Sequence, residues 1–237
     1  MATLNAMLSV VIPVLNEEKV ILRLLEDIDC CRKECEFSIE TIIVDGGSTD
    51  NTVAMCKKYD ANVFSSPPGR GQQLALGANH AAGQNLLFLH ADCRLSPEHC
   101  QTVVAALNEE QVAAGGFQLH FNDSHWILRL AERINNIRFS MTRIIYGDHG
   151  LFVRRKTYFE VGGFSDMPLF EDIEFSKKVK KLGNVRLYSP SMVTSSRRFK
   201  TGGVIRTYLK MAFLHIAFWV GVPATTLSRW YEKGTFR

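Results

Sequence analysis

The sequence is poor in the cysteine and histidine patterns that build metal sites and disulfide frameworks. Six cysteines occur in 237 residues, but none form a C-x-x-C pair and no histidine cluster has zinc-site spacing. Two cysteines are adjacent, which suits a disulfide framework poorly. We therefore expect all six to be reduced thiols, as in a cytosolic protein: Cys30, Cys31, Cys35, Cys56, Cys93 and Cys100.

Segments for secretion and for membrane crossing are missing as well. Residues 1–7 carry no basic n-region, so no signal peptide is predicted. The apolar run 211–222, interrupted by His215, is shorter than the about 20 residues that an ordinary spanning helix needs. We expect a cytoplasmic protein, either free in solution or peripheral on the cytoplasmic face of the membrane.

Glycine-rich phosphate loops are absent where two other classes of nucleotide enzyme need them. No G-x-G-x-x-G follows a predicted strand, which argues against a NAD-dependent dehydrogenase. A sugar-nucleotide pyrophosphorylase would need a glycine-rich loop with a Lys or Arg directly after the first strand. The segment that stands there, 13–17, is not such a loop.

The composition is that of a folded protein with a sizeable core. Hydrophobic residues make up 46% and charged residues 22% of the chain, whose length suits one large α/β domain. The net charge of +4 is uneven, because residues 197–237 hold eight Lys or Arg and one acid, Glu232. The basic end indicates contact with lipid headgroups or a diphosphate, and we expect no nucleic-acid partner. A solvated helix face is the alternative.

Apolar runs alternate with helical patterns along the chain. Runs typical of buried strands occur at 8–14, 41–44, 62–64, 86–89, 113–121, 151–153 and 185–188. Helical patterns occur at 20–28, 49–58, 72–82, 126–141 and 170–182. The alternation predicts an α/β, Rossmann-like fold, with a mostly parallel sheet covered by helices on both faces.

Polar residues directly follow three of the predicted strands. Asn16 and Glu17 come after the first strand, Asp45 after the second and Asp92 after the fourth. Ligands of open α/β sheets bind beyond the carboxyl ends of the strands. Acidic motifs at three such ends therefore predict a polar cleft, although each acid taken alone also suits a cap or a turn.

An ordered set of motifs resembles the family 2 glycosyltransferases with the GT-A fold. The set is V-I-P-V-L-N-E-E at 11–18, I-V-D-G-G-S-T-D-N-T at 43–52, G-R-G at 69–71, L-H-A-D at 89–92 and F-E-D-I-E-F at 170–175. The resemblance covers about residues 8–199; each motif is weak alone, but the ordered set is specific. The most similar part of the family is a bacterial subgroup with His-Ala-Asp and Gly-Asp-x-Gly motifs.

The resemblance implies that the donor nucleoside lies against the first two loops. Pro13, Asn16 and Glu17 would line its pocket, with the Glu17 carboxylate accepting hydrogen bonds from ribose hydroxyls or a base N–H. Asp45 would bind the base, and Gly46 would let the backbone approach the ligand closely. The alternative roles are a first-turn helix acid for Glu17 and an Asx-turn for Asp45.

The resemblance also implies a diphosphate site with a divalent ion. Arg70 would clamp the diphosphate, because a guanidinium fork matches phosphate oxygens; the alternative is a surface arginine on a loop. His90-Ala91-Asp92 stands where the family has Asp-x-Asp, so Asp92 and His90 are the expected ligands of Mn²⁺ or Mg²⁺, with Ala91 in the donor site. One imidazole beside one carboxylate favours Mn²⁺. A satisfied strand-end histidine is the alternative for His90.

Glu171 and Asp172 match the acid pair of the family. An inverting transfer needs a base that takes the proton of the acceptor hydroxyl as its oxygen attacks C1 of the sugar. By the resemblance Asp172 is that base, with Glu171 the next candidate, and helix capping is the alternative for both. Residues 147–150 and 197–199 would shape the acceptor side.

Residues 204–237 are expected to form a helical appendage to a transferase domain at 1–203. Cations and aromatic residues flank the apolar run 211–222: Arg206, Lys210, Trp219, Arg229, Trp230, Tyr231 and Lys233. This combination suits a helix that lies in the interface of an anionic membrane. A core-packing helix or a contact in a homodimer is the alternative.

The sequence therefore predicts an inverting, metal-assisted glycosyltransferase. It would move a sugar from a nucleotide-diphosphate sugar to an acceptor hydroxyl, and a lipid-linked acceptor is one candidate. Two alternatives stay open: a sugar-nucleotide pyrophosphorylase, and a catalytically degenerate protein of this fold that binds nucleotides or partners. His90 in place of an acid favours degeneracy, whereas the retained Asp92 and Asp172 argue against it.

Overall fold

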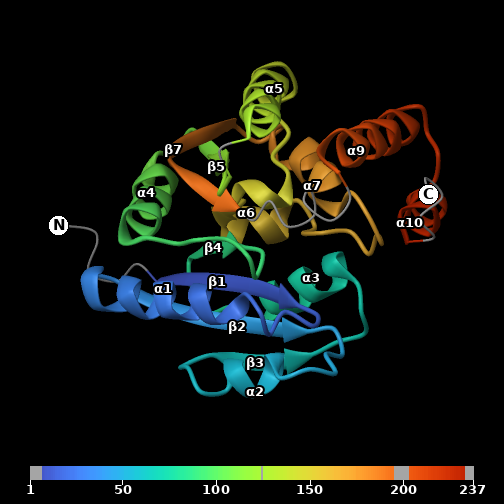
Figure 1. Cartoon of the computed structure of the whole chain (residues 1–237). Coiled ribbons are helices and arrows are strands. Elements are labelled where there is room, and N and C mark those ends of the chain that lie inside the picture. The colour runs from blue at the N-terminus through green and yellow to red at the C-terminus, as the bar shows by residue number, and fades with distance from the viewer. Residues whose placement is uncertain (1–6, 124, 195–202, 233–237) are drawn as a thin grey trace.

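The fold is built on one seven-stranded sheet (Figure 1). The structure, a computed structural model, describes residues 7–123, 125–194 and 203–232. The spatial order of the strands is β3-β2-β1-β4-β6-β5-β7. Their bounds are β1 (Met7–Val14), β2 (Ser38–Asp45), β3 (Asn62–Ser65), β4 (Asn85–Phe88), β5 (Val112–Phe121), β6 (Phe152–Arg154) and β7 (Asn184–Thr194).

Most neighbouring strands run parallel. β1 pairs in parallel with β2 and β4, and β2 pairs in parallel with β3, so the carboxyl ends of these four strands meet at one edge of the sheet. β5 and β7 are also parallel, whereas β6 is antiparallel to both β4 and β5. The reversal at β6 was not predicted, because a short apolar run carries no information about strand direction.

Helices cover both faces of the sheet. Alternate residues of β1 enter two separate cores: Ile12 packs with α1 and α4, and Val11 packs with α3, α6 and α7. This confirms the predicted α/β fold. The helices are α1 (Ile21–Glu34), α2 (Thr52–Cys56), α3 (Arg70–His80), α4 (Pro97–Asn108), α5 (Trp126–Thr142), α6 (Arg155–Glu160), α7 (Glu171–Val179), α9 (Val204–Trp219) and α10 (Ala224–Glu232), with the 3-10 turn η1 (Gly147–His149).

Several element ends differ from the predicted ones. The helix expected over 49–58 is the short α2, because the Asp50 carboxylate accepts the Thr52 amide at 3.0 Å and holds the preceding residues in a turn. The last strand runs on to Thr194, since β7 stays paired with β5 beyond an irregularity between Phe117 and Leu119.

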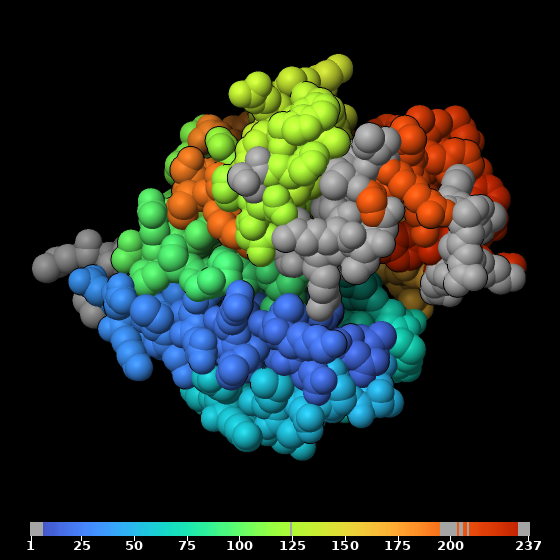
Figure 2. Space-filling view, in the orientation of Figure 1, coloured from blue at the N-terminus to red at the C-terminus, as the bar shows by residue number. Residues whose placement is uncertain are grey.

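The C-terminal helices pack one face on the rest of the molecule. Leu214 and Ala217 of α9 and Leu227 of α10 share a buried cluster with three residues outside these helices, Ile144, Phe170 and Ile173. In Figures 1 and 2 the two helices form a lobe at the right of the molecule. Within the part of the chain that the structure describes, no helix has both the length and the apolarity to cross a membrane.

Candidate active site

The loops after β1 and β2 are joined by hydrogen bonds at the carboxyl edge of the sheet. Asn16, with a left-handed φ of 55°, donates its amide to Ser48 Oγ at 2.9 Å and accepts the Thr49 amide on its Oδ1 at 2.8 Å. The Glu17 amide donates to Thr52 Oγ1 at 2.8 Å. Two of the predicted nucleoside-binding positions therefore lie on one rigid surface, and the hydroxyls that fix them were not predicted.

Asp45 ends β2 and holds its own turn together. Its carboxylate accepts the amides of Gly47 and Ser48, both at 3.1 Å, and the residue is buried. The Asx-turn considered for Asp45 is therefore present. It places the carboxylate beside the loop that carries Asn16, so the turn and a contact to a nucleotide base are compatible.

Gln73 is a structural residue of the site that sequence reasoning missed. Its side-chain amide, buried within α3, donates to the carbonyls of Val14 at 3.0 Å and Val44 at 2.7 Å, and so joins the ends of β1 and β2. A Cβ added at Gly46 would come within 3.1 Å of Gln73 Nε2, so a side chain there would press on the amide that joins the two strands. The sequence carries no signal for this role, because nothing in it distinguishes Gln73 from the adjacent Gln72.

Arg70 meets the predicted acid pair from the other half of the chain. It is the first residue of α3, and its Nε donates to Glu171 Oε1, while its Nη2 lies 3.6 Å from Asp172 Oδ2. Glu171 is 1% exposed. The guanidinium therefore offsets part of the charge of a buried acid pair, a role that the sequence did not predict. Contact between Arg70 and a diphosphate stays a prediction.

The backbone before α7 is bent sharply to present the two acids. Phe170 adopts a left-handed φ of 69°, which is unfavourable for a bulky residue, and its ring is buried in the cluster with α9. Glu171 and Asp172 then occupy the first turn of α7. Such a strained residue beside polar groups is typical of functional sites.

Asp172 is held by two backbone amides and still resists ionisation. Its Oδ2 accepts the amide of Gly147 at 2.7 Å, and its Oδ1 accepts the amide of Ile173 at 2.8 Å. Burial and the charge of Glu171 raise the pKa of Asp172 to about 6, although Arg70 and the two amides act to lower it. Asp172 can therefore exchange a proton near neutral pH.

His90 and Asp172 face the same small space beside Gly147. A Cβ added at Gly147 would lie 2.8 Å from His90 Nε2 and 3.5 Å from Asp172 Oδ2. The next residue in η1, Asp148, has a buried Oδ1 that makes no hydrogen bond with the described residues. The fully buried His149 binds the Phe117 carbonyl at 2.8 Å, and its burial lowers its pKa. η1 thus lies between His90, which follows β4, and Asp172 of the acid pair.

The predicted metal motif follows β4. Ala91 is buried, whereas His90 and Asp92 are partly exposed. Among the described residues, no group of three or more His, Cys, Asp or Glu side chains is arranged to hold a metal ion. An imidazole and a carboxylate at one strand end still suit an ion whose other ligands come from a diphosphate. The predicted acceptor-side residues Arg197, Arg198 and Phe199 lie outside the described residues.

The larger part of the chain matches one family. The family model described as Glycosyl transferase family 2 matches residues 9–167. The chain belongs to glycosyl transferase family 2. The family predicted from the ordered motifs is confirmed, and with it a glycosyltransferase at the level of the family.

One relative within glycosyl transferase family 2 is the undecaprenyl-phosphate 4-deoxy-4-formamido-L-arabinose transferase of Proteus mirabilis (strain HI4320), which is 30% identical over 154 residues. The match covers 62% of this chain and 47% of that protein. A second relative with the same description, from Serratia proteamaculans (strain 568), gives the same coverage. The chain thus spans about half the length of the curated relatives it matches.

Solved structures of similar proteins support the fold. A mannosyltransferase from Pyrobaculum calidifontis, in complex with GDP-Man and Mn²⁺, has a TM-score of 0.65 at 18% identity, covering 94% of this chain and 69% of that one. TarS from S. aureus has a TM-score of 0.62 at 20% identity, covering 85% and 64%. At these identities the likeness shows the GT-A fold alone, and it confirms the prediction of that fold.

Proposed function

We propose that this chain transfers a sugar, with inversion, from a nucleoside-diphosphate sugar to an acceptor hydroxyl. The observation that carries the proposal is Asp172, a buried carboxylate with a raised pKa in the first turn of α7, beside Arg70 and the amide of Gly147. Membership of the family and the complexes of the Pyrobaculum mannosyltransferase with GDP-Man and Mn²⁺ support the donor class. A poised base argues against a degenerate, purely binding protein.

The donor would lie across the ends of β1, β2 and β4. Pro13, Asn16 and Glu17 would hold the nucleoside, and Asp45 with Gly46 would contact the base. Arg70, Ala91 and Asp92 would border the diphosphate. A divalent ion held by Asp92 and His90 would supply positive charge to the diphosphate; the Mn²⁺ in the Pyrobaculum complex favours Mn²⁺ over Mg²⁺.

The acceptor hydroxyl would approach from the side of η1. Its oxygen attacks C1 of the sugar while Asp172 takes the hydroxyl proton, a new C1–O bond forms, and the bond from C1 to the diphosphate oxygen breaks. The electron pair of that bond leaves with the nucleoside diphosphate. The Gly147 and Ile173 amides hold the Asp172 carboxylate in place, and Arg70 offsets the charge of Glu171 beside it.

A panel of nucleotide sugars tests the donor class. The matching donor at about a hundredfold above its Kd stabilises the fold by about 2.7 kcal/mol, which raises the melting temperature by roughly 5–10 °C for a domain of this size. Thermal-shift measurements with and without Mn²⁺ identify base and sugar. The nucleoside monophosphates of the same bases serve as matched controls and are expected to raise the melting temperature less. No shift with any nucleoside diphosphate or its sugars contradicts the proposal.

A lipid-linked acceptor fits the outer face of α9. The relative from Proteus mirabilis is described as acting on undecaprenyl phosphate. In this chain Leu209, Phe213, Ile216 and Trp219 are exposed along α9, whose inner face packs on Phe170 beside the acid pair. Residues 204–237 would hold a transferase domain, 1–203, at the cytoplasmic face of an anionic membrane. A homodimer contact through the same face is the alternative.

Point variants on the outer face of α9 test this contact. Truncation before Val204 would uncover Phe170 and Ile173, so the substitution Ile216→Glu, at a side chain that is 64% exposed, is the sharper change. Co-sedimentation with phosphatidylglycerol vesicles is expected to fall about tenfold, because a buried isoleucine contributes about 1.5–3 kcal/mol. Ile216→Leu is the matched control. Equal pelleting of both variants would assign the face to another partner.

A further inference from the structure

The helix α5, inside the transferase fold, carries an uncovered apolar stripe. Its five exposed hydrophobic side chains are between 47% and 81% exposed. They follow one another at spacings of three or four residues, so they lie along one side of the helix. The stripe consists of Trp126, Leu130, Ile134, Ile137 and Met141.

The opposite side of α5 already forms a core. Leu128 and Ala131 pack with Leu119 and Phe121 of β5, and Phe139 enters the core above the sheet. The side of α5 that packs on the rest of the protein therefore does not include the side chains of the stripe. Large contiguous apolar surfaces of this kind mark contacts with other molecules.

The exposed charges on α5 itself are of one sign. Arg133 is exposed beside the stripe, whereas Arg143, the residue that caps the helix, lies over the ring of the inward-facing Phe139. The one acid of α5, Glu132, is turned inward: its carboxylate accepts from Arg129 Nη1 at 2.7 Å and from the Phe121 amide at 2.7 Å. Among the described residues of α5, no acid is exposed. The surface is thus apolar with an arginine, Arg133, at its border, which complements an anionic lipid surface.

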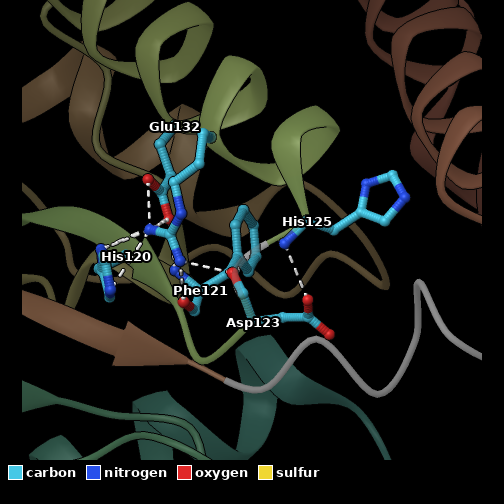
Figure 3. Close-up of polar contacts among 6 residues, drawn as sticks. His120, Phe121, Asp123, His125 and Glu132 are labelled. Atoms are coloured by element: carbon cyan, nitrogen blue, oxygen red, sulfur yellow. Dashed lines mark hydrogen bonds and ion pairs between the residues drawn. The ribbon is translucent and has the colours of Figure 1, made fainter.

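Hydrogen bonds of Arg129 and Glu132 fix the helix to the sheet. Arg129 Nη1 contacts His120 Nδ1 at 2.8 Å and Glu132 Oε1 at 2.7 Å, and Figure 3 shows His120, Phe121 and Glu132 gathered where β5 meets α5. Arg129 Nη2 donates to the Phe121 carbonyl at 2.9 Å, and the His125 amide donates to Asp123 Oδ1 at 2.9 Å. The stripe is therefore presented by a rigid element rather than by a free segment.

The second apolar stripe of the molecule lies on a neighbouring helix. α9 contacts α5 and stands next to it in Figure 1. Its exposed side chains also follow helical spacing, with a cation at the start: Arg206, Leu209, Phe213, Ile216 and Val220. We propose that the stripe of α5 lies in the interface of an anionic lipid bilayer and extends the contact made by α9. The inference rests on the proposed lipid contact of α9.

A second copy of the chain is the less suitable occupant. A two-fold interface would place the same patch against itself, so the Arg133 side chains of the two copies would be drawn toward one interface without an exposed acid on either α5. A stable dimer buries about 800 Å² on each partner, and on one helix this would bury Arg133. A bilayer with anionic headgroups instead pairs with Arg133.

Contact through α5 would also orient the active site. The chain leaves α5 at Thr142 and reaches η1, which binds Asp172, within five residues. Arg138, on the inner side of α5, donates from Nη1 to the Ile144 carbonyl at 3.0 Å and stacks 3.5 Å above the Tyr146 ring. A surface bound to α5 is thus coupled to the acceptor side of the site by a short, packed segment.

The double substitution Ile137→Glu with Met141→Glu, in the full chain, tests the proposal. Both side chains are more than 60% exposed, so the fold is expected to melt at the same temperature. Binding to phosphatidylglycerol vesicles, measured by co-sedimentation, is expected to fall by about tenfold or more. The matched control is Leu22→Glu, an exposed leucine of α1 on the other layer of the molecule, which is expected to bind vesicles as the unchanged chain does.

Two further measurements separate the outcomes. Sedimentation velocity without lipid reports a dimer: if the double variant converts a dimer to a monomer and leaves vesicle binding unchanged, the stripe is a subunit interface and the proposal is wrong. If Ile216→Glu loses vesicle binding but the α5 variant does not, the lipid contact of α9 stands and that of α5 fails. Thermal shift with the donor, which needs no lipid, shows separately whether the transferase function holds.

Discussion

Replacing Asp172 with asparagine is expected to lower the turnover number by about 10²–10⁴-fold, the usual contribution of a general base. An amide has nearly the same shape, but its single oxygen can accept from only one of the Gly147 and Ile173 amides, and it cannot take the acceptor proton. The affinity for the donor is expected to stay within a few-fold, because the nucleotide would lie at the ends of β1 and β2. Steady-state kinetics and calorimetric titration of the nucleotide measure the two quantities.

The matched control is Glu174→Gln on the same helix. Glu174 pairs with Lys177 at 2.8 Å on the surface of α7, so loss of its charge is expected to leave turnover unchanged. Near-normal turnover in Asp172→Asn would place the base elsewhere, with Glu171 the next candidate.

The pH profile separates a base from a purely structural acid. The pKa of Asp172 is raised to about 6, so the carboxylate is protonated below that pH and turnover is expected to rise roughly tenfold per pH unit until it levels off near pH 6. The free energy of unfolding changes with pH in the opposite direction. Because the pKa of Asp172 is raised in the folded state, the stability that its protonated carboxyl gives below the ordinary carboxyl pKa of about 4 is lost as the pH rises through about 6. Asp172→Asn removes that loss but also one backbone hydrogen bond, so its melting temperature is expected to depend less on pH between about 4 and 6 than that of the unchanged chain.

The elements that the sequence predicted best are the buried parallel strands. Runs such as Val10–Val14 and Ile42–Val44 are apolar on both sides because both of their faces are covered. The direction of β6 and the length of β7 depend on pairing with distant strands, which local periodicity does not encode. The ends of several elements differ from the predicted ones because single side chains set them, as the Asp50 carboxylate does by accepting the Thr52 amide.

The sequence predicted where the residues of the candidate site stand along the chain, but not which side chains contact one another. Strand ends and motif order located Asn16, Asp45 and Asp92 at one edge, since parallel strands bring their carboxyl ends together. The pairing of Arg70 with Glu171 joins residues 101 positions apart, and no spacing rule reaches that far. Gln73 was missed because nothing in the sequence distinguishes it from the adjacent Gln72, and the apolar stripe of α5 was missed because a helical pattern does not show which face stays uncovered.

Donor binding is expected to need both a divalent ion and Asp92. A diphosphate concentrates negative charge, and a bound ion is worth several kcal/mol against it. Removal of the ion with EDTA, or Asp92→Ala, is therefore expected to weaken the nucleoside diphosphate on the order of 10²-fold in calorimetric titration. Asp60→Asn, which removes an acid with a 96% exposed side chain far from these strand ends, is the matched control and should leave affinity unchanged.

The substitution His90→Asp decides what the imidazole contributes. It restores the Asp-x-Asp pattern, and hard oxygen ligands suit Mg²⁺, so the ratio of affinities in Mg²⁺ and Mn²⁺ is expected to move toward Mg²⁺. His90 Nε2 lies next to Gly147, whose amide holds Asp172, so turnover and metal preference are measured together. An unchanged metal ratio would make His90 a positioning residue of η1 rather than a ligand. For the prediction on Asp92, the contradicting outcome is an affinity for the nucleoside diphosphate that stays unchanged both in EDTA and in Asp92→Ala. Arg70 and other cations would then bind the diphosphate without a metal.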